Sequence, residues 1–354
     1  MLIKRILLVS VAILLVGAFV LAGCAKPATA PTSQEPIELK FAYWFPPVSP
    51  PGSRAIEPWG DVIEKATNGR VKITFYGGET LGKAPDHYDL CLKRTADITA
   101  IDPSFTPGVF PLCEAITLPM QFPSSEVAAE VWWDLMEKYM AKAECSKVKV
   151  LWVYPTATFQ MMTRTKQVRT LEDLKGMKFS ATSPMLAKTT EALGAVPVVM
   201  AEPDIYTSLE RGLIDGRWCD WECAWTWKAY EVTKYRTDNI GLGVNTNIVV
   251  MNLDSWNSLP PDIQKIIDEN TGFDKSRSCG AMFEALPDEF LPKLLDYDQK
   301  AGNPEIYSLP ESERERWVEA VGPVCDDWAN DMEAKGLPGK QVLEDLRSLV
   351  KKYS

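Results

Sequence analysis

Residues 215–227, DGRWCDWECAWTW, place four tryptophans and three acids within thirteen positions. The faces of tryptophan rings attract cations, and neighbouring carboxylates add to that attraction, so the segment could hold an organic cation. Trp218, Trp221 and Trp225 also recur at the spacing of one helix face, which is typical of core packing. We expect Trp218 and Asp220 to form the wall of a binding site, and Trp225 and Trp227 to pack in the core or on the surface.

Other chemistry finds little support in the residue types. His87 is the only histidine, and its surroundings, APDHYDLCLKR, are interpreted as an exposed helix start. General bases and zinc ligands are most often histidines, and no GxSxG, HExxH or glycine-rich phosphate loop is present. Cys219 and Cys223 have loose metal-ligand spacing without a second pair. We therefore predict no catalytic residue, no metal and no cofactor, and that the protein is not an enzyme.

The N-terminus is typical of an export signal. Lys4 and Arg5 precede an apolar run over 6–20, which leads to Leu-Ala-Gly-Cys24. This ending resembles a bacterial lipobox, so residues 1–23 are predicted to be a lipoprotein signal peptide and Cys24 to carry the lipid. An uncleaved membrane anchor is the alternative, although the run is short for a spanning helix. Residues 24–36, rich in Pro, Ser and Thr, are predicted to be a flexible tether outside the cytoplasm.

Composition limits what the remaining chain can be. The 318 residues beyond the tether exceed the size at which single cores divide, so two domains are expected. Without Lys4 and Arg5, 36 basic side chains face 48 acidic ones, which gives a net charge near −12 and argues against nucleic-acid binding. Seven cysteines follow Cys24, and an odd number leaves at least one thiol free.

Strand and helix patterns alternate along the chain, which indicates an α/β fold with largely parallel sheets. Strands are predicted at 37–45, 70–78, 96–102, 148–154 and 245–252, with helices over 53–69, 84–95 and from 125 onwards. The chain is mostly helical after Leu259. Ligands of open α/β sheets bind beyond the carboxyl ends of strands. Those ends carry Trp44, Phe45, Asp102, Ser104, Gln160, Ser180, Thr182 and the segment at Arg217 and Trp218.

The order of several motifs carries a family likeness. They are FAYWFP, GRVKITFYGGETLG, ADITAID, TLEDLKGMKF, EALGAVPVVMAEPDIYTSLERGLIDG and NLDSWNSLPPDIQKII. The chain resembles the DctP-like solute-binding subunits of TRAP transporters. The resemblance implies a two-lobed periplasmic-binding-protein-like fold, with mixed, mostly parallel sheets joined by hinge strands and a long helix. It also implies delivery of a solute to TRAP membrane permease subunits.

The resemblance also suggests how the chain divides into parts. Lobe I would comprise 37–157 and about 246–285, lobe II 158–245 and about 286–330, and 331–354 would be a C-terminal helical extension. The predicted ligand-binding residues are Trp44, Phe45, Asp102, Ser104, Gln160, Ser180, Thr182, Tyr206, Arg217, Trp218, Asp220 and Asn245.

Two positions depart from the family pattern. Ser180 stands where an arginine usually binds the ligand carboxylate, and Gln160 where a second arginine is expected. Arg217 or Arg164 could supply the missing cation, which would keep an organic acid as ligand, slightly favoured here. Alternatively the ligand is an organic amine or aromatic compound. An organic cation could then be held by Trp44, Trp218, Trp221 and Trp225 beside Asp220 and Glu222. A solute sensor docking on a receptor kinase is a further alternative, and an extracytoplasmic enzyme is the least favoured one.

Overall fold

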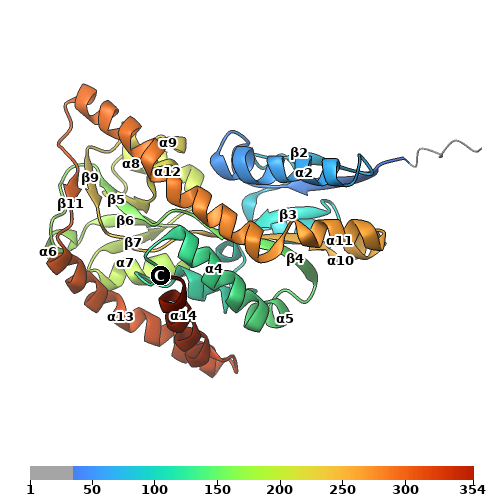
Figure 1. Cartoon of the computed structure of the whole chain (residues 1–354). Helices are drawn as coiled ribbons and strands as arrows, with labels where there is room; N and C mark the ends of the chain where they lie inside the picture. The colour runs from blue at the N-terminus through green and yellow to red at the C-terminus, as the bar shows by residue number, and fades with distance from the viewer. Residues whose placement is uncertain (1–34) are drawn as a thin grey trace, which may run out of the picture. The chain divides into compact units, whose positions relative to one another are not determined.

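Two mixed β-sheets organise residues 37–354, and the computed structural model describes residues 35–354 (Figure 1). The predicted signal peptide and Cys24 lie outside the described residues. The first sheet has the order β2-β1-β3-β10-β4. Its strands are β1 (Ile37–Ala42), β2 (Val71–Tyr76), β3 (Ile98–Ile101), β4 (Val148–Pro155) and β10 (Thr246–Asn252). β1 pairs in parallel with β2 and β3, whereas β10 is antiparallel to β3 and β4.

The second sheet has the order β11-β9-β5-β8-β6-β7. Its strands are β5 (Gln160–Thr163), β6 (Lys178–Ala181), β7 (Val196–Val199), β8 (Gly216–Cys219), β9 (Tyr235–Asp238) and β11 (Tyr307–Ser308). β6 pairs in parallel with β7 and β8, while β5 is antiparallel to β8 and β9. We call the first sheet with its helices lobe I and the second lobe II. The predicted two-lobed architecture with mixed sheets is confirmed.

The helices follow the expected alternation. Those associated with lobe I are α2 (Glu57–Ala66), α3 (His87–Leu92), α4 (Ser125–Leu135), α5 (Ala141–Ala143), α10 (Leu253–Ser258) and α11 (Pro261–Glu269). Those of lobe II are α6 (Leu171–Leu174), α7 (Pro184–Ala192), α8 (Glu202–Glu210), α9 (Trp221–Thr226) and α13 (Glu311–Ala334). α14 (Gly339–Tyr353) packs on α4 and α13. The predicted boundary between residues 330 and 331 therefore falls inside a helix.

Polar side chains cap two helix starts. Ser124 caps α4, where its side chain accepts a hydrogen bond from Val127 N at 3.1 Å. Thr170 and Asp173 form the reciprocal capping box that opens α6. These caps satisfy backbone N–H groups that have no partner within the first turn.

The chain passes between the lobes along three segments. Residues 156–159 lead from β4 to β5 and residues 239–245 lead back from β9 to β10. The two segments pair with each other, because Thr156 N donates to Asn245 O at 2.9 Å and Phe159 N donates to Gly243 O at 2.8 Å. The third segment is α12 (Gly272–Ala301), which contacts α4 and β4 of lobe I and α9 of lobe II (Figure 1). The predicted boundary between residues 285 and 286 falls inside this helix.

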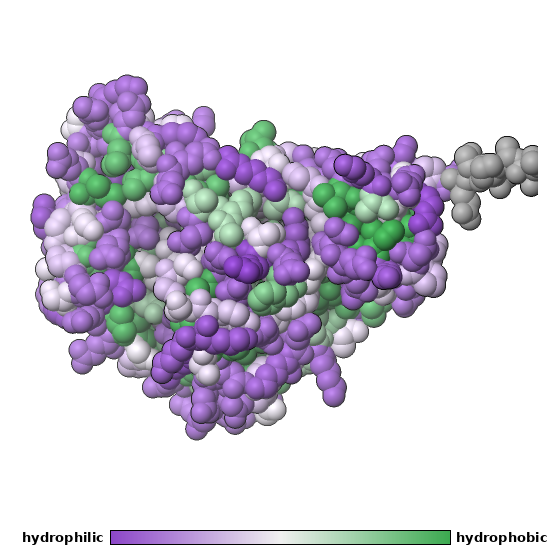
Figure 2. Space-filling view, viewed as in Figure 1, coloured by the Kyte–Doolittle hydropathy of each residue, from purple (hydrophilic) through white to green (hydrophobic). Residues whose placement is uncertain are grey.

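Aromatic side chains fill both cores. In lobe I, the ring centroids of Trp59 and Trp152 lie 5.0 Å apart, and Phe41 packs against both rings. In lobe II, Trp218 stacks on Phe179 with centroids 4.6 Å apart and meets Trp317 edge to face. The face in Figure 2 is mostly hydrophilic with small separate hydrophobic patches.

Two predictions about single residue types need correction or completion. His87 does begin α3, but it is 1% exposed rather than on the surface, and its Nε2 lies 3.3 Å from Gly82 O. Burial lowers the pKa of His87, since the charged imidazolium loses its hydration. All seven cysteines of the described residues are free thiols, and six of them are buried.

Candidate functional site

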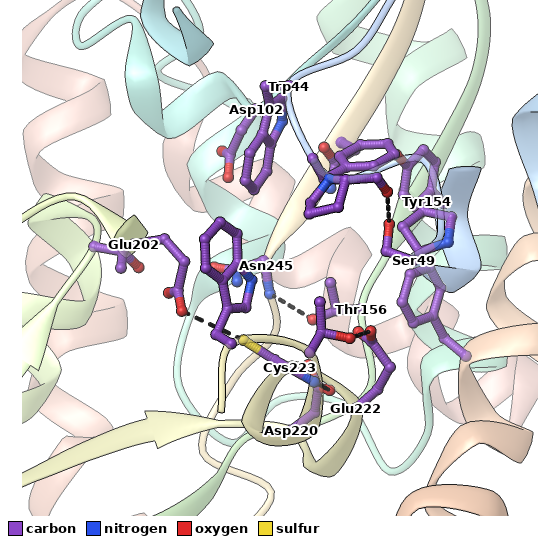
Figure 3. A pocket seen from close by; sticks show the side chains of 18 of the residues that line it. Trp44, Ser49, Asp102, Tyr154, Thr156, Glu202, Asp220, Glu222, Cys223 and Asn245 are labelled. Atoms are coloured by element: carbon purple, nitrogen blue, oxygen red, sulfur yellow. Dashed lines mark hydrogen bonds between the residues drawn. The ribbon is translucent and has the colours of Figure 1, made fainter. Parts of the chain in front are cut away.

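A cavity lies between the two lobes, with about 670 Å³ of empty space that is partly open to solvent (Figure 3). Lobe I and the segments next to it contribute Trp44, Phe45, Pro46, Ser49, Pro51, Asp102, Phe105, Tyr154, Thr156, Asn245 and Asn247. Lobe II contributes Thr182, Glu202, Asp220, Glu222, Cys223, Thr226 and Trp227, and α12 contributes Phe283. A cleft between two lobes is a usual place for a small-molecule site.

The lobe I wall is mainly aromatic. Trp44 and Phe45 follow β1 directly, so the end of the strand delivers both rings to the cavity. Trp44 meets Phe105 edge to face with centroids 5.3 Å apart. Tyr154, from β4, stacks on Phe283 of α12 at 5.8 Å. This wall offers a large apolar surface to a solute.

Asp102 is the acid of the lobe I wall. It follows β3, and its Oδ1 accepts a hydrogen bond from Ser104 N at 2.8 Å, which caps a short helical turn over 103–105. Burial raises the pKa of Asp102 to about 6, although the hydrogen bonds from Ser104 lower it. Ser104 itself lines a neighbouring hollow at the mouth of the cavity, together with Lys83 and Glu79.

The lobe II wall is acidic because α9 begins at the cavity. Asp220 ends β8 and caps α9, with its Oδ1 accepting from Cys223 N at 2.8 Å. Glu222 is 7% exposed and accepts a hydrogen bond from Thr226 Oγ1. Burial raises the pKa of Asp220 to about 6, and burial together with the charge of Asp220 raises that of Glu222 to about 8.

Arg217 lies behind this wall and does not line the cavity. It is 1% exposed on β8, opposite Ser180 of β6 in the sheet register. Its Nη2 lies 2.8 Å from Glu202 Oε1 and donates to Cys223 Sγ at 3.2 Å. Both partners line the cavity, so the guanidinium is engaged with the wall. The role of Arg217 in ligand binding stays a prediction, and the guanidinium of Arg164 packs beside Gly212.

Trp218 also lies away from the cavity. Successive residues of a strand point to opposite faces of the sheet, so Trp218 faces the core of lobe II while Arg217 faces the cavity wall. Its Nε1 donates to Thr190 Oγ1 at 3.0 Å. Trp227, expected to pack in the core or on the surface, lines the cavity instead, whereas Trp225 stacks on Tyr230 at 4.7 Å.

The remaining predicted residues divide between cavity and scaffold. Trp44, Phe45, Asp102, Thr182, Asp220 and Asn245 line the cavity. Gln160 and Ser180 do not; Gln160 Oε1 accepts from Ile240 N at 3.1 Å. Tyr206 lies on α8 and its hydroxyl donates to Glu231 Oε2 at 3.2 Å, next to a separate surface hollow. Their roles in ligand binding stay predictions.

The predicted ligand-binding residues do not include several residues that line the cavity. Glu222 is predicted only for the amine alternative, and its spacing of two from Asp220 at a helix start is the signal that places it there. Glu202 looked like a routine acid in a first helical turn, where acids are favoured for the helix dipole alone. Tyr154, Asn247 and Phe283 come from a strand interior and a long helix, where no local pattern distinguishes cavity from core.

A family model described as "Bacterial extracellular solute-binding protein, family 7" matches residues 41–331. The chain belongs to this family. The C4-dicarboxylate-binding periplasmic protein DctP of Rhodobacter capsulatus is 29% identical over 313 residues, which cover 87% of this chain and 91% of that protein. The family consists of periplasmic solute-binding proteins rather than enzymes.

Solved structures of TRAP solute-binding proteins have the same fold. One from Rhodoferax ferrireducens, in complex with copurified benzoate, has a TM-score of 0.84 and 30% identity, and covers 90% of this chain and 98% of that chain. Another, from Bordetella bronchiseptica with bound mandelate, has a TM-score of 0.80 and 25% identity, with 90% and 100% covered. The chain is therefore a TRAP-type protein that captures a solute for a TRAP transporter, as the sequence predicted. Within residues 35–354, no helix has the length and apolar character needed to cross a bilayer.

Proposed function

We propose that this chain captures a small organic solute by closing its two lobes around the cavity and then delivers the solute, chemically unchanged, to the permease of a TRAP transporter. The observation that carries the proposal is that a single cavity is lined by side chains from both lobes. Trp44 of lobe I and Trp227 of lobe II border the same space, so a solute there would contact both lobes. Binding energy that depends on both walls favours the closed arrangement over the open one.

The residues of the cavity support binding rather than catalysis. Its lining contains hydroxyl, thiol and carboxyl groups but no histidine, and His87 is buried in α3 outside it. The hydrogen bond with Cys219, together with burial, raises the pKa of the Cys223 thiol, so this thiol is a poor nucleophile. The proposal therefore includes no step in which a bond of the solute is made or broken.

Closure is testable by small-angle X-ray scattering. Protein unfolded in guanidinium and refolded after dialysis is freed of its solute, and the released solute is identified by mass spectrometry. We expect the radius of gyration of the solute-free protein to fall when that solute is added back, because the lobes close. A radius of gyration that does not change, with the solute demonstrably bound, would contradict capture by closure.

We also propose that Cys24 carries the lipid that holds the protein at the membrane. The lipobox-like Leu-Ala-Gly-Cys24 supports this. Cys24→Ala is expected to move most of the protein from the membrane fraction to the soluble extracytoplasmic fraction. Lys26→Gln, which changes a tether residue and keeps the thiol, should remain with the membrane. If Cys24→Ala is still retained by the membrane, the anchor is the apolar run and not a lipid.

A further inference from the structure

The cavity has an excess of acidic groups. Four carboxyls line it, those of Asp102, Glu202, Asp220 and Glu222, and within residues 35–354 its lining includes no Lys, Arg or His. Of the four, only Glu202 forms an ion pair in the described part of the chain, with Arg217 at 2.8 Å.

The other guanidinium nearby is also already paired. Arg54 acts on Glu222 through its charge, but its Nη1 is 2.7 Å from Glu289 on α12. Both guanidiniums that act on the cavity acids are therefore engaged with carboxylates. The charge of the empty cavity is left unbalanced by the protein itself.

Three buried polar atoms in the cavity wall have no hydrogen-bond partner within residues 35–354. They are Trp44 Nε1, Asn247 Oδ1 and the hydroxyl of Tyr154, the last two in residues that are 3% and 1% exposed. Buried polar groups are nearly always paired, so these atoms are available to a ligand or to water in the cavity. An amide oxygen can only accept, which suits an N–H donor on the solute. Trp44 Nε1 is an unpaired donor and suits an acceptor such as a hydroxyl on the same solute.

Aromatic rings border the same space from both sides. Trp44 and Phe105 lie on the lobe I side, Trp227 on the lobe II side, and Phe283 on α12. Ring faces attract a cation and do not attract an anion, and the attraction grows when water is excluded. The rings also bury the apolar body of a solute.

We propose that the solute is an organic cation, an ammonium or alkylated ammonium group carried on an apolar or aromatic body. The inference rests on the proposed solute capture and departs from the solved relatives above, which hold benzoate and mandelate. A carboxylate placed here would meet Asp102, Asp220 and Glu222 without a free cation, which is unfavourable at short range in a partly dry cavity. A cation would neutralise these groups and satisfy Asn247.

The protonation states of the cavity carboxyls are consistent with the binding of a cation. The carboxyl cluster at the start of α9 consists of Asp220 and Glu222. The charged and titratable groups around it are those of Glu202, Cys223, Arg54 and Arg217. Burial raises the pKa of Asp220 to about 6 and that of Glu222 to about 8, so part of the cluster is protonated in the empty site at neutral pH. A bound cation stabilises the charged carboxylates, so cation binding should release protons and strengthen as the pH rises from 6 to 8.

Isothermal titration calorimetry with a series of similar size and different charge tests the inference. Benzylamine, benzoate and benzyl alcohol share one ring and carry a positive, negative or zero charge at neutral pH. We expect benzylamine to bind at least tenfold more tightly than the other two at pH 8, to weaken at pH 6, and to release protons, detected with buffers of different ionisation enthalpy. The solute released on unfolding should carry a positive charge.

Several results would overturn the organic-cation inference and leave the proposed solute capture intact. They are tighter binding of benzoate, equal binding of benzyl alcohol, or release of an anionic or neutral solute while the lobes still close. Benzoate binding that requires added Ca²⁺ would also overturn it, because the carboxyls would then hold a metal; no cluster of three metal-ligating side chains exists among the described residues. Absence of both benzylamine binding and a cationic solute overturns it as well.

Variants separate charge from shape. Glu222→Gln and Asp220→Asn keep the size of each side chain, and Asn can still cap α9. Each is expected to weaken benzylamine binding at least tenfold at pH 8 and to change benzyl alcohol binding less than twofold. Glu210→Gln, an exposed change at the far end of α8, is the control and should leave both unchanged. Equal losses for the amine and the alcohol would indicate a structural role and overturn the assignment.

Discussion

Arg217→Met is expected to lower the free energy of unfolding by about 3–5 kcal/mol, because it leaves a buried carboxylate without its partner. Glu202 is 8% exposed and its Oε1 receives the guanidinium at 2.8 Å, with no other ion pair to that carboxylate in residues 35–354. Methionine fills a similar volume, so the loss measures the charge rather than a cavity. Urea denaturation followed by circular dichroism gives the change.

Two comparisons define what the Arg217→Met result means. Arg316→Met removes an exposed guanidinium that pairs with Glu172 and Glu313, and it should cost far less than Arg217→Met because solvent screens the pair. Combining Arg217→Met with Glu202→Met should recover much of the stability, because no charge is then left buried. A loss below about 1 kcal/mol for Arg217→Met would mean that Glu202 turns toward solvent, and Arg217 would again be free to meet a ligand.

Gly280→Val should lower the free energy of unfolding by about 3 kcal/mol, because α12 approaches α4 too closely for a side chain. A Cβ atom on Gly280 would lie 2.7 Å from Ala129 Cβ, 2.7 Å from Ser125 O and 2.9 Å from Glu126 Cα. Two of these atoms are backbone, so the helices must separate. The expected result is a lower melting temperature, measured by differential scanning calorimetry.

Gly322→Ala is the matched control for that prediction. Gly322 is also inside a long helix, α13, but nothing lies within 4 Å of the Cβ position. Alanine is favoured over glycine in a helix by about 0.5–1 kcal/mol, but the ring of the following Pro323 disfavours a helical residue that carries a Cβ before it, so this variant should change the free energy of unfolding much less than Gly280→Val does. If both glycine variants change stability equally, helix propensity rather than the contact between α12 and α4 determines the result.

The sequence predicted the elements better than the side-chain environments. Alternation and capping signals depend on neighbouring residues, which is why β1, the Ser124 cap and the box at Thr170 follow from the chain alone. Residues at strand ends, such as Trp44 and Asp102, could also be placed at the cleft, because sheet topology brings those ends together.

The side of the sheet to which each side chain of β8 points was harder to predict. Arg217 and Trp218 are consecutive in an extended strand, so they cannot both point to the same side. The sequence indicates the alternation but not which face meets the second lobe, and the structure places one residue behind the wall and the other in the core. Buried acids such as Glu202 depend on a partner fifteen residues away in sequence, and no local pattern reveals that pairing.

The seven reduced thiols have a consequence for how the protein must mature. The periplasm, where this family works, oxidises accessible cysteines to disulfides. In the native protein burial protects six of the seven, and it raises the pKa of Cys91 and Cys145 to about 12, which leaves almost no thiolate to react. Before an exported chain folds, its thiols are not buried and can be oxidised. The yield of folded protein therefore depends on whether the two cores fold before non-native disulfides form. An added reductant should increase that yield.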